Sequence, residues 1–492
     1  MTVIKNTTIY LGVSVFQSLM SFLLLPVFTF FLTKTEFGLA SVINSVAGLL
    51  GLLFVFGTQS VISRLYFEYK DDPEKLKRFL GTRFISKIFW NIVIASILIL
   101  GRSFIFPYIA KDVDFNPYLL IAIGIAFFNT IFIIYQTLQQ TKQEGLKYAI
   151  SQCSYLLLNN GITVLLLLVF KMKAEGIVLG TLAADIIMTL VVLFKLRKQI
   201  SFCIDKTILR LAFTFSWPIF FHGLFSWSLS SVNKLLLNSL ISTEIVAVYS
   251  VGFVIAGIMS MVTIALNRSY TPWFFQQMKK EKKDYTEVVK FAEFIILVYS
   301  VIALGLSLFS SDIVSILVNR SYGEAWKVIP LLSFAYVFNG VYFFFVNIFN
   351  YKKQAVKFVP LLSLFSAIIN ISLNFVLIPK LGMFGSALAT LISMIFLSLT
   401  TYFGSRKFLN IGFGYIKMIT PVLITSLMAS FVYIDFGLSF WTNFFLKIIH
   451  MILCLVVLYL VYRKTFGENL EKQVINIKKY LDGIKGSHHN NK

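Results

Sequence analysis

Long runs of mostly apolar residues recur along the whole chain, and they constrain its fold more than any other feature. A run of about 20 such residues can cross the hydrocarbon core of a bilayer as an α-helix. Uninterrupted segments such as 49–56 and 162–170 do not alternate between apolar and polar residues, so they do not fit the strands of a membrane β-barrel. The runs therefore predict an all-α, polytopic integral membrane protein.

Composition supports this prediction and leaves little of the chain for a soluble domain. Of the 492 residues, 58% are hydrophobic and 13% are charged, whereas soluble domains average about 25% charged residues. Runs of membrane-crossing length number about 14. They lie at residues 7–32, 37–62, 79–100, 117–138, 148–170, 176–194, 211–237, 245–266, 288–309, 328–349, 357–378, 383–403, 415–434 and 441–462. A large extramembrane catalytic domain is thereby excluded.

Basic residues gather in alternate linkers between these runs, within a net charge of +22. The basic linkers lie near residues 64–83, 142–147, 195–210, 268–290, 352–357 and 406–417 and in the C-terminal tail. Because cytoplasmic loops retain Lys and Arg, we expect both termini in the cytoplasm of a bacterial inner membrane. The charge then orients the chain and contacts anionic headgroups, so we expect membrane lipids and no nucleic acid as partners.

An internal repeat organises the spans. Residues 147–198 align with residues 357–407, and the pair Thr35-Glu36 matches Thr243-Glu244. The repeat predicts an N-lobe of six helices at 1–200, a C-lobe of six at 208–407, two further helices at 411–465 and a basic cytoplasmic tail at 466–492. Lobes with an even number of spans enter the membrane in the same orientation, and duplicated carriers of this kind bind substrate between their lobes.

Several segments, taken in order, resemble the Wzx-type flippases of polysaccharide biosynthesis. Residues 22–41 resemble the first helix and outer turn of that family, residues 57–69 the exit of its second helix, and residues 217–237 its seventh helix. The resemblance implies the multidrug/oligosaccharidyl-lipid/polysaccharide exporter superfamily, which also holds drug exporters and lipid II flippases. Relatives often carry an Asp-Arg pair where this chain has Asn233-Lys234, so an acid at that place cannot be a coupling group.

Four basic residues are candidates for a path that binds an anionic headgroup. An anion that enters a cavity loses water and needs ammonium or guanidinium donors in its place. The candidates are Arg64, Lys87, Lys234 and Arg268. Arg64 and Arg268 occupy comparable ends of the second and eighth helices and, with Lys87, would form an entrance for a diphosphate. Lys87 and Lys234 could equally extend to nearby headgroups, and we expect Lys447 to extend outward from its span.

Two helices that the repeat makes equivalent each carry a polar face. His222, Ser226 and Asn233 fall on one side of the seventh helix. Gln17 lies with Ser14, Ser18 and Ser21 on one side of the first helix. The shared pattern predicts a hydrophilic cavity between the lobes, and the alternative for the serines is close packing of helices through small residues.

Asp185 is the acid nearest the centre of a predicted span. A charge at the bilayer centre costs about 2.5 to 3.5 kcal/mol on insertion scales, so this carboxyl needs a cation, a cavity or a proton. It is a candidate coupling site for H⁺ or Na⁺, and the alternative is a salt bridge or hydrogen bond between helices. We expect no cofactor and no metal site, because Cys153, Cys203 and Cys454 have neither paired spacing nor ligand companions.

Together these features predict a carrier rather than an enzyme. The expected function is to translocate undecaprenyl-diphosphate-linked oligosaccharide units to the outer leaflet by alternating access, for O-antigen, lipopolysaccharide, capsule or exopolysaccharide synthesis. Expected partners are that lipid-linked substrate, a polysaccharide polymerase and glycosyltransferases. The alternatives within the superfamily are a cation-coupled drug exporter and a lipid II flippase. A membrane polymerase is disfavoured, because such an enzyme needs a sizeable outer loop or clustered carboxylates.

Overall fold

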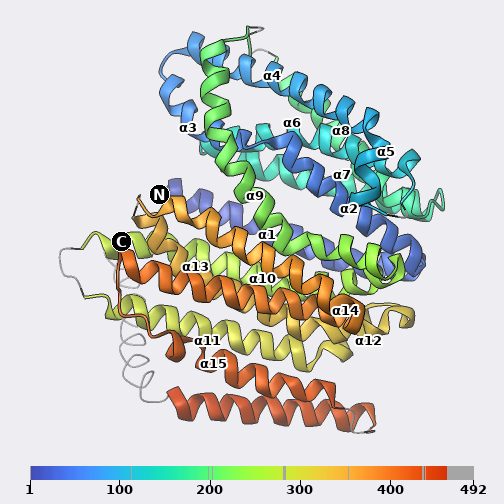
Figure 1. Ribbon diagram of the computed structural model, residues 1–492, viewed down its shortest axis with the longest axis vertical. Helices are drawn as coiled ribbons and strands as arrows, with labels where there is room; N and C mark the ends of the chain where they lie inside the picture. Colours follow the sequence, from blue (N-terminus) through green and yellow to red (C-terminus); the bar gives the residue numbers. More distant parts are fainter. Residues whose placement is uncertain are drawn as a thin grey trace, which may run out of the picture.

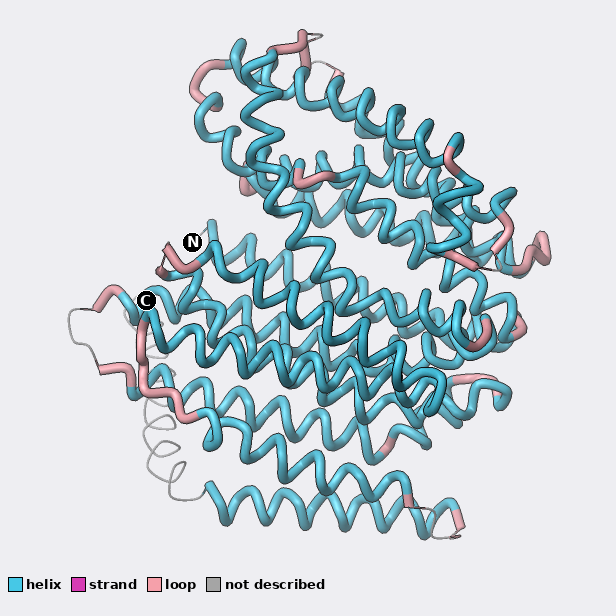
Figure 2. The backbone as a smooth tube through the Cα atoms, in the orientation of Figure 1, coloured by secondary structure: helices cyan, strands magenta, loops and turns pink. Residues whose placement is uncertain are grey.

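A computed structural model describes residues 2–111, 113–197, 199–201, 203–280, 284–352, 354–434, 437 and 439–462. Every regular element in these ranges is helical (Figure 2), so the predicted all-α fold is confirmed. The basic tail predicted at 466–492 lies outside the described residues. The α-helices are α1 (Thr2–Phe31), α2 (Lys34–Val55), α3 (Thr58–Tyr69), α4 (Pro73–Leu100), α5 (Arg102–Ile109), α6 (Leu120–Thr141), α7 (Gly145–Leu168), α8 (Ala174–Leu196), α9 (Lys206–Leu240), α10 (Thr243–Met278), α11 (Thr286–Leu308), α12 (Ser310–Leu317), α13 (Ile329–Tyr351), α14 (Val359–Phe408) and α15 (Tyr415–Ala429).

Within the described residues, 13 helical segments are long and apolar enough to cross a membrane. The last of them is Phe440–Tyr462, and α2 and α3 together make one segment, Lys34–Tyr69. α14 covers both of the predicted spans 357–378 and 383–403, because Gly382 with φ 58° and ψ −137° breaks it into two helical halves. This backbone conformation is readily open only to glycine. If the two halves of α14 are counted as separate spans, the 13 segments become 14, which is the predicted number.

The helices form two bundles (Figure 1). α2 to α8 make the upper bundle in this view, and α10 to α15 make the lower one. α9 crosses between them and packs on α2, α3 and α4 as well as on α14, while α1 packs on α7 and α10. The lobe limits drawn from the repeat remain a prediction. In the structure, α9 packs on helices of both bundles.

The two bundles make close contacts at one end of the molecule. We call the end with the linkers after α3, α6, α8 and α10 the basic end, and the other the opposite end. At the opposite end the Thr35 hydroxyl donates to Glu244 at 2.8 Å, and the Tyr322 hydroxyl donates to the Leu32 carbonyl at 3.0 Å. A Cβ on Gly38 would lie 2.0 Å from the Thr243 carbonyl oxygen, so α2 and α10 touch through their backbones. The bundles are therefore joined tightly at the opposite end.

The last two spans are fastened to the second bundle by ion pairs. Lys417 at the start of α15 contacts Glu293 of α11 at 3.1 Å. In the last helix, Lys447 is 8% exposed and pairs with Asp312 of α12. The expectation that Lys447 extends outward is therefore wrong. A carboxylate within reach in the protein replaces the headgroup contact that a lone lysine would need, and the hydroxyl of Ser311 accepts a second bond from the same ammonium at 2.7 Å.

Candidate functional site

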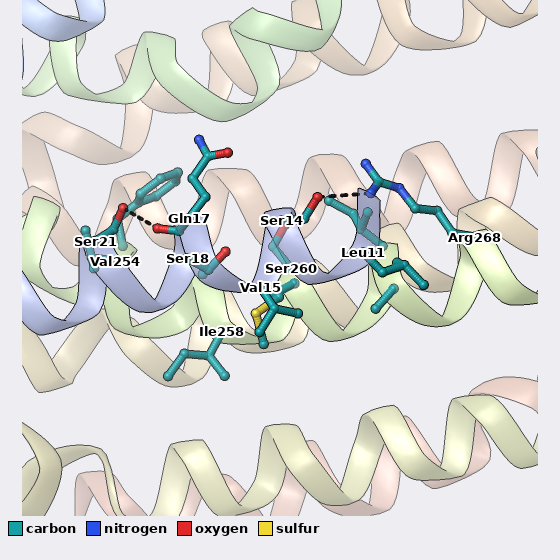
Figure 3. A pocket seen from close by; sticks show the side chains of 15 residues that line it. Leu11, Ser14, Val15, Gln17, Ser18, Ser21, Val254, Ile258, Ser260 and Arg268 are labelled. Atoms are coloured by element: carbon teal, nitrogen blue, oxygen red, sulfur yellow. Dashed lines mark hydrogen bonds between the residues drawn. The ribbon is translucent and has the colours of Figure 1, made fainter. Parts of the chain in front are cut away.

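A cavity of about 390 Å³, polar on one side, lies between α1 and α10, where the two bundles adjoin (Figure 3). We call it the seam cavity. The four polar residues predicted to share one face of the first helix all line it, and they are Ser14, Gln17, Ser18 and Ser21. The α10 side is mostly apolar, with Val254, Ile258 and Met261 among its residues. The predicted polar face of the first helix therefore does border a cavity at the junction of the bundles.

Arg268 is the charged residue of the seam cavity. Its guanidinium donates to the Ser14 hydroxyl at 3.0 Å (Figure 3). That hydroxyl donates in turn to the Tyr10 carbonyl of the preceding turn. This backbonding is common for serine in helices and leaves the hydroxyl oxygen free to accept. Within the described residues none of the ion pairs includes Arg268. A guanidinium with only a neutral partner can offer its remaining N–H donors to an anion.

Arg64 lies in a second cavity, of about 490 Å³, against the α3 and α6 helices. All its other lining residues are polar and uncharged: Gln59, Ser60, Ser63, Thr137 and Gln140. The guanidinium lies 4.1 Å from the centre of the Phe215 ring of α9, a cation–π contact. Arg64 thus stands where the first bundle meets the helix that crosses to the second.

Lys87 lines a third cavity, of about 560 Å³, between α3, α4 and α9. Arg83 lies one turn before it and lines the same cavity, although the sequence reasoning counted Arg83 among the linker residues. α4 begins at Pro73, before the predicted start at residue 79, and Arg83, which the predicted span also contained, is buried within it. The i, i+4 spacing of Arg83 and Lys87 is the signal that could have found the pair, because residues four apart share a helix face.

The predicted polar face of the seventh helix lines none of the three cavities. Asn233 is buried, and its amide donates to the Thr390 and Tyr249 hydroxyls at 2.7 and 3.1 Å and accepts from Asn374 at 3.0 Å. That network ties α9 to α10 and α14 and leaves Asn233 outside the three cavities. His222 and Ser226 are likewise absent from the cavity linings. The sequence predicts which residues share one side of α9, but the path of this helix between the bundles decides which neighbours those residues contact.

Lys234 makes a cation–π contact with an aromatic ring of α10. Its ammonium lies 4.9 Å from the centre of the Phe253 ring, and Phe253 also lines the seam cavity. The cation–π contact holds the ammonium one ring away from that cavity. Of the four basic residues predicted for an anion path, Arg268 alone lines the seam cavity, Lys234 lies behind the Phe253 ring, and Arg64 and Lys87 line separate cavities of the first bundle.

Asp185 lies in the interior of the first bundle and is fully buried. Asn129 of α6 donates to one carboxyl oxygen at 2.8 Å, and the Tyr155 hydroxyl of α7 is close to the same group. The other oxygen, Oδ2, has no hydrogen-bond partner in the described residues. The hydrogen bond between helices that we left open as an alternative therefore exists.

No group of three or more His, Cys, Asp and Glu side chains that could hold a metal ion occurs in the part of the chain that the structure describes. The chemistry that the three cavities offer is the binding of negative charge by guanidinium and ammonium groups beside hydroxyls and amides.

Comparisons with known proteins place this architecture among transporters of related fold. The lipid II flippase MurJ, in an inward closed conformation, superposes with a TM-score of 0.72 at 15% identity over 94% of this chain and 100% of that one. The MATE transporter VcmN of Vibrio cholerae gives a TM-score of 0.56 at 17% identity over 86% of this chain and 98% of its own. At these identities the likeness concerns the fold.

Sequence relatives and a family model identify the family. A Haemophilus influenzae protein described as "Lsg locus putative protein 1" is 23% identical over 384 residues, 76% of this chain and 90% of its own length. An "Uncharacterized membrane protein" of the same organism is 22% identical over 287 residues, 57% of this chain and 67% of its own. The family model described as "Polysaccharide biosynthesis protein" matches residues 3–278, more than half of the 492 residues. The chain therefore belongs to the polysaccharide biosynthesis protein family.

Proposed function

We propose that this protein is a flippase that carries a diphosphate-linked oligosaccharide, attached to an undecaprenyl lipid, from the inner to the outer leaflet of the bacterial inner membrane. The observation that carries the proposal is Arg268 in the seam cavity, an arginine that faces serines where the two bundles adjoin and has no carboxylate partner among the described residues. Family membership supports a role in polysaccharide synthesis. The name of the structural relative MurJ, a lipid II flippase, supports a lipid-linked substrate.

The physical demands of such a substrate match what the cavities offer. Sugar hydroxyls cannot cross hydrocarbon without hydrogen-bond partners, so the headgroup needs a polar route while the lipid tail stays in the bilayer. Arg268, Arg64 and Lys87 would replace the water around the diphosphate. Moving negative charge out of a cell that is negative inside releases about 2.3 kcal/mol per charge per 100 mV, so the membrane potential alone favours export.

The arrangement of the bundles supports alternating access from the basic end. The bundles are joined at the opposite end through Gly38, Thr243 and the bond from Thr35 to Glu244. We place the basic end in the cytoplasm, since basic linkers are retained on that side. The substrate would then enter from the cytoplasmic leaflet, where glycosyltransferases build it, and leave on the outer face, where a polymerase uses it.

We further propose that Asp185 couples transport to H⁺ or Na⁺. Its unpartnered Oδ2 and complete burial support a group that exchanges a cation. The repeat supports this role as well. Asp185 aligns with Met394, so the second bundle adopts its fold without an acid at that position.

Drug export, the second candidate, is favoured by the likeness to the MATE transporter VcmN. It is disfavoured by the cavities, whose charged residues are basic and would repel a cationic drug.

The test is export in a strain that lacks its own flippase and carries this protein. Arg268→Ala should abolish surface polysaccharide and leave lipid-linked oligosaccharide on the inner leaflet, at unchanged protein abundance, while Arg268→Lys retains part of the activity. Arg197→Ala is the matched control, since Arg197 is an exposed arginine at the basic end that lines none of the three cavities. Full export by Arg268→Ala would remove the seam cavity from the mechanism.

A further inference from the structure

The cavity between α3, α4 and α9 is distinct from the seam cavity and is lined by two buried basic side chains. Arg83 is 7% exposed and Lys87 is 4% exposed. Both project from one face of α4, at i and i+4, where Cβ atoms lie about 5 to 6 Å apart. Arg210 of α9 lines the same cavity and is exposed. Three basic side chains from two helices therefore converge on one space of about 560 Å³.

No carboxylate of the described residues forms an ion pair with Arg83, Lys87 or Arg210. Asp205, which precedes α9, uses one carboxylate oxygen to cap that helix by accepting from the backbone N–H groups of Thr207 and Ile208 at 2.8 and 3.3 Å. Two adjacent buried basic groups repel each other when both are charged, and burial has removed most of their water. Their burial side by side is unfavourable unless an anion compensates them.

The hydrogen-bonding capacity of Arg83 is largely unused. Its Nη2 donates to the Thr58 hydroxyl at 3.1 Å, and this is a neutral partner. Its Nε is buried and has no hydrogen-bond partner within the described residues. A guanidinium offers five N–H donors in a planar fork that matches the oxygens of a phosphate. The Thr58 contact fixes the orientation of the fork, and the remaining donors are left for a ligand.

The far wall of the cavity is built at a conformational cost to the backbone. Phe56 and Gly57, between α2 and α3, both have left-handed backbone angles, with φ 40° and φ 65°. This places the Phe56 ring 5.1 Å from the Trp90 ring and 5.7 Å from the Phe213 ring, so that α2, α4 and α9 meet in one aromatic cluster. A Cβ on Gly57 would lie 2.7 Å from the Ser216 Cα, so only glycine permits the close approach of α9. A strained residue held by its surroundings in this way is typical of a functional site.

We infer that Arg83 and Lys87 form a phosphate-binding site for the diphosphate of the lipid-linked substrate, separate from the seam cavity and on the first bundle. This inference rests on the proposed function. The chemistry it commits to is a phosphorylated headgroup, whose oxygens accept from the Arg83 fork and the Lys87 ammonium while the apolar wall at Phe56 and Trp90 excludes water. Arg210, being exposed, makes the first contact with the approaching anion.

Binding of pyrophosphate to the purified full-length protein in nanodiscs of neutral phosphatidylcholine tests the site, by isothermal titration calorimetry. Arg83→Gln and Lys87→Gln should each weaken binding by about 10- to 100-fold, as expected for loss of a charge-assisted hydrogen bond. Arg83→Lys, which keeps the charge, should retain more affinity than Arg83→Gln and guards against a variant that does not fold. Arg102→Gln, outside the cavity, is the matched control and should bind as the unaltered protein does.

The same titration distinguishes the sources of the phosphate. Undecaprenyl diphosphate in the nanodisc should compete with pyrophosphate, whereas phosphatidylglycerol should not. Competition by phosphatidylglycerol alone would overturn the inference by assigning the site to bilayer lipid. Equal binding by Arg83→Gln, Lys87→Gln and the unaltered protein would also overturn it. In that second case the proposed function still stands if Arg268→Ala abolishes export, so the two failures are separable.

Discussion

At the scale of single residues, the repeat makes a comparison possible within one chain. Asp185 and Met394 occupy aligned positions, and each meets an asparagine of a neighbouring helix. Asn129 donates to Asp185 at 2.8 Å, and Asn339 lies 3.9 Å from the Met394 sulfur. The asparagine is retained in both bundles while the acid is present in one. A structural need for the acid would apply to both bundles, so its presence in one favours a role in function.

Asp185→Asn tests this role. The amide oxygen of the replacement can still accept from Asn129, so we expect normal folding and normal substrate binding. The neutral side chain cannot exchange a proton or hold Na⁺, so transport into reconstituted vesicles should no longer respond to an imposed ion gradient. Glu68→Gln, at an exposed acid near the basic end, is the control and should keep the response. A gradient response in Asp185→Asn equal to that of the unaltered protein would exclude it as the coupling site.

At the scale of helices, the contact between α2 and α10 depends on the absence of a side chain. Gly38 faces the Thr243 carbonyl, and these residues lie beside the repeated Thr-Glu pairs that begin the two helices. Glu36 closes a capping box at the start of α2 by accepting from the Thr33 backbone N–H at 2.9 Å. The local sequence thus fixes where α2 begins, and the glycine fixes how closely α10 can approach.

Gly38→Ala should loosen that junction. The added methyl would lie 2.0 Å from a backbone oxygen, so the two helices must separate, at a cost of about 1 to 3 kcal/mol for the state in which they touch. We expect a lower thermal midpoint and faster labelling of a cysteine placed at Thr35. Gly51→Ala in the same helix is the matched control, because its Cβ would meet nothing within 4 Å. Unchanged labelling in Gly38→Ala would show that the junction adapts without opening.

At the scale of the whole molecule, the spans and the architecture could be predicted because hydropathy and membrane thickness leave few alternatives. The site was predicted in part. Ser14 and Gln17 line a cavity as predicted, but its other wall is α10 with Arg268, and Asn233 of the expected partner helix is bound within a network of α9, α10 and α14. Arg83 was missed because it was grouped with the basic linker at 64–83, although the predicted span 79–100 already contains it. Which helix lies opposite a given face is decided by packing, and no periodicity in one segment encodes it.

Orientation in the membrane is the prediction that belongs to this scale. If the basic end is cytoplasmic, a membrane-impermeant thiol reagent applied to intact cells should label Thr35→Cys and miss Lys75→Cys, in a background without Cys153, Cys203 and Cys454. Permeabilised cells should show labelling at both positions, which controls for reactivity. Labelling of residue 75 alone in intact cells would show that the membrane orientation is the reverse of the one predicted, and the proposed direction of transport would be wrong.

α9 has a consequence for how this protein can vary. Its first half is held to the first bundle by Phe213 at Phe56 and by Ser216 at Gly57, and its second half is held to the second bundle by Asn233 at Thr390. One inserted residue between these anchors would rotate one set by about 100° relative to the other. Insertions elsewhere can be absorbed in linkers, but this helix has none between its anchors. The number of residues between these anchors therefore sets how the two bundles are oriented relative to each other. Natural variants should change the side chains of α9 and never its length.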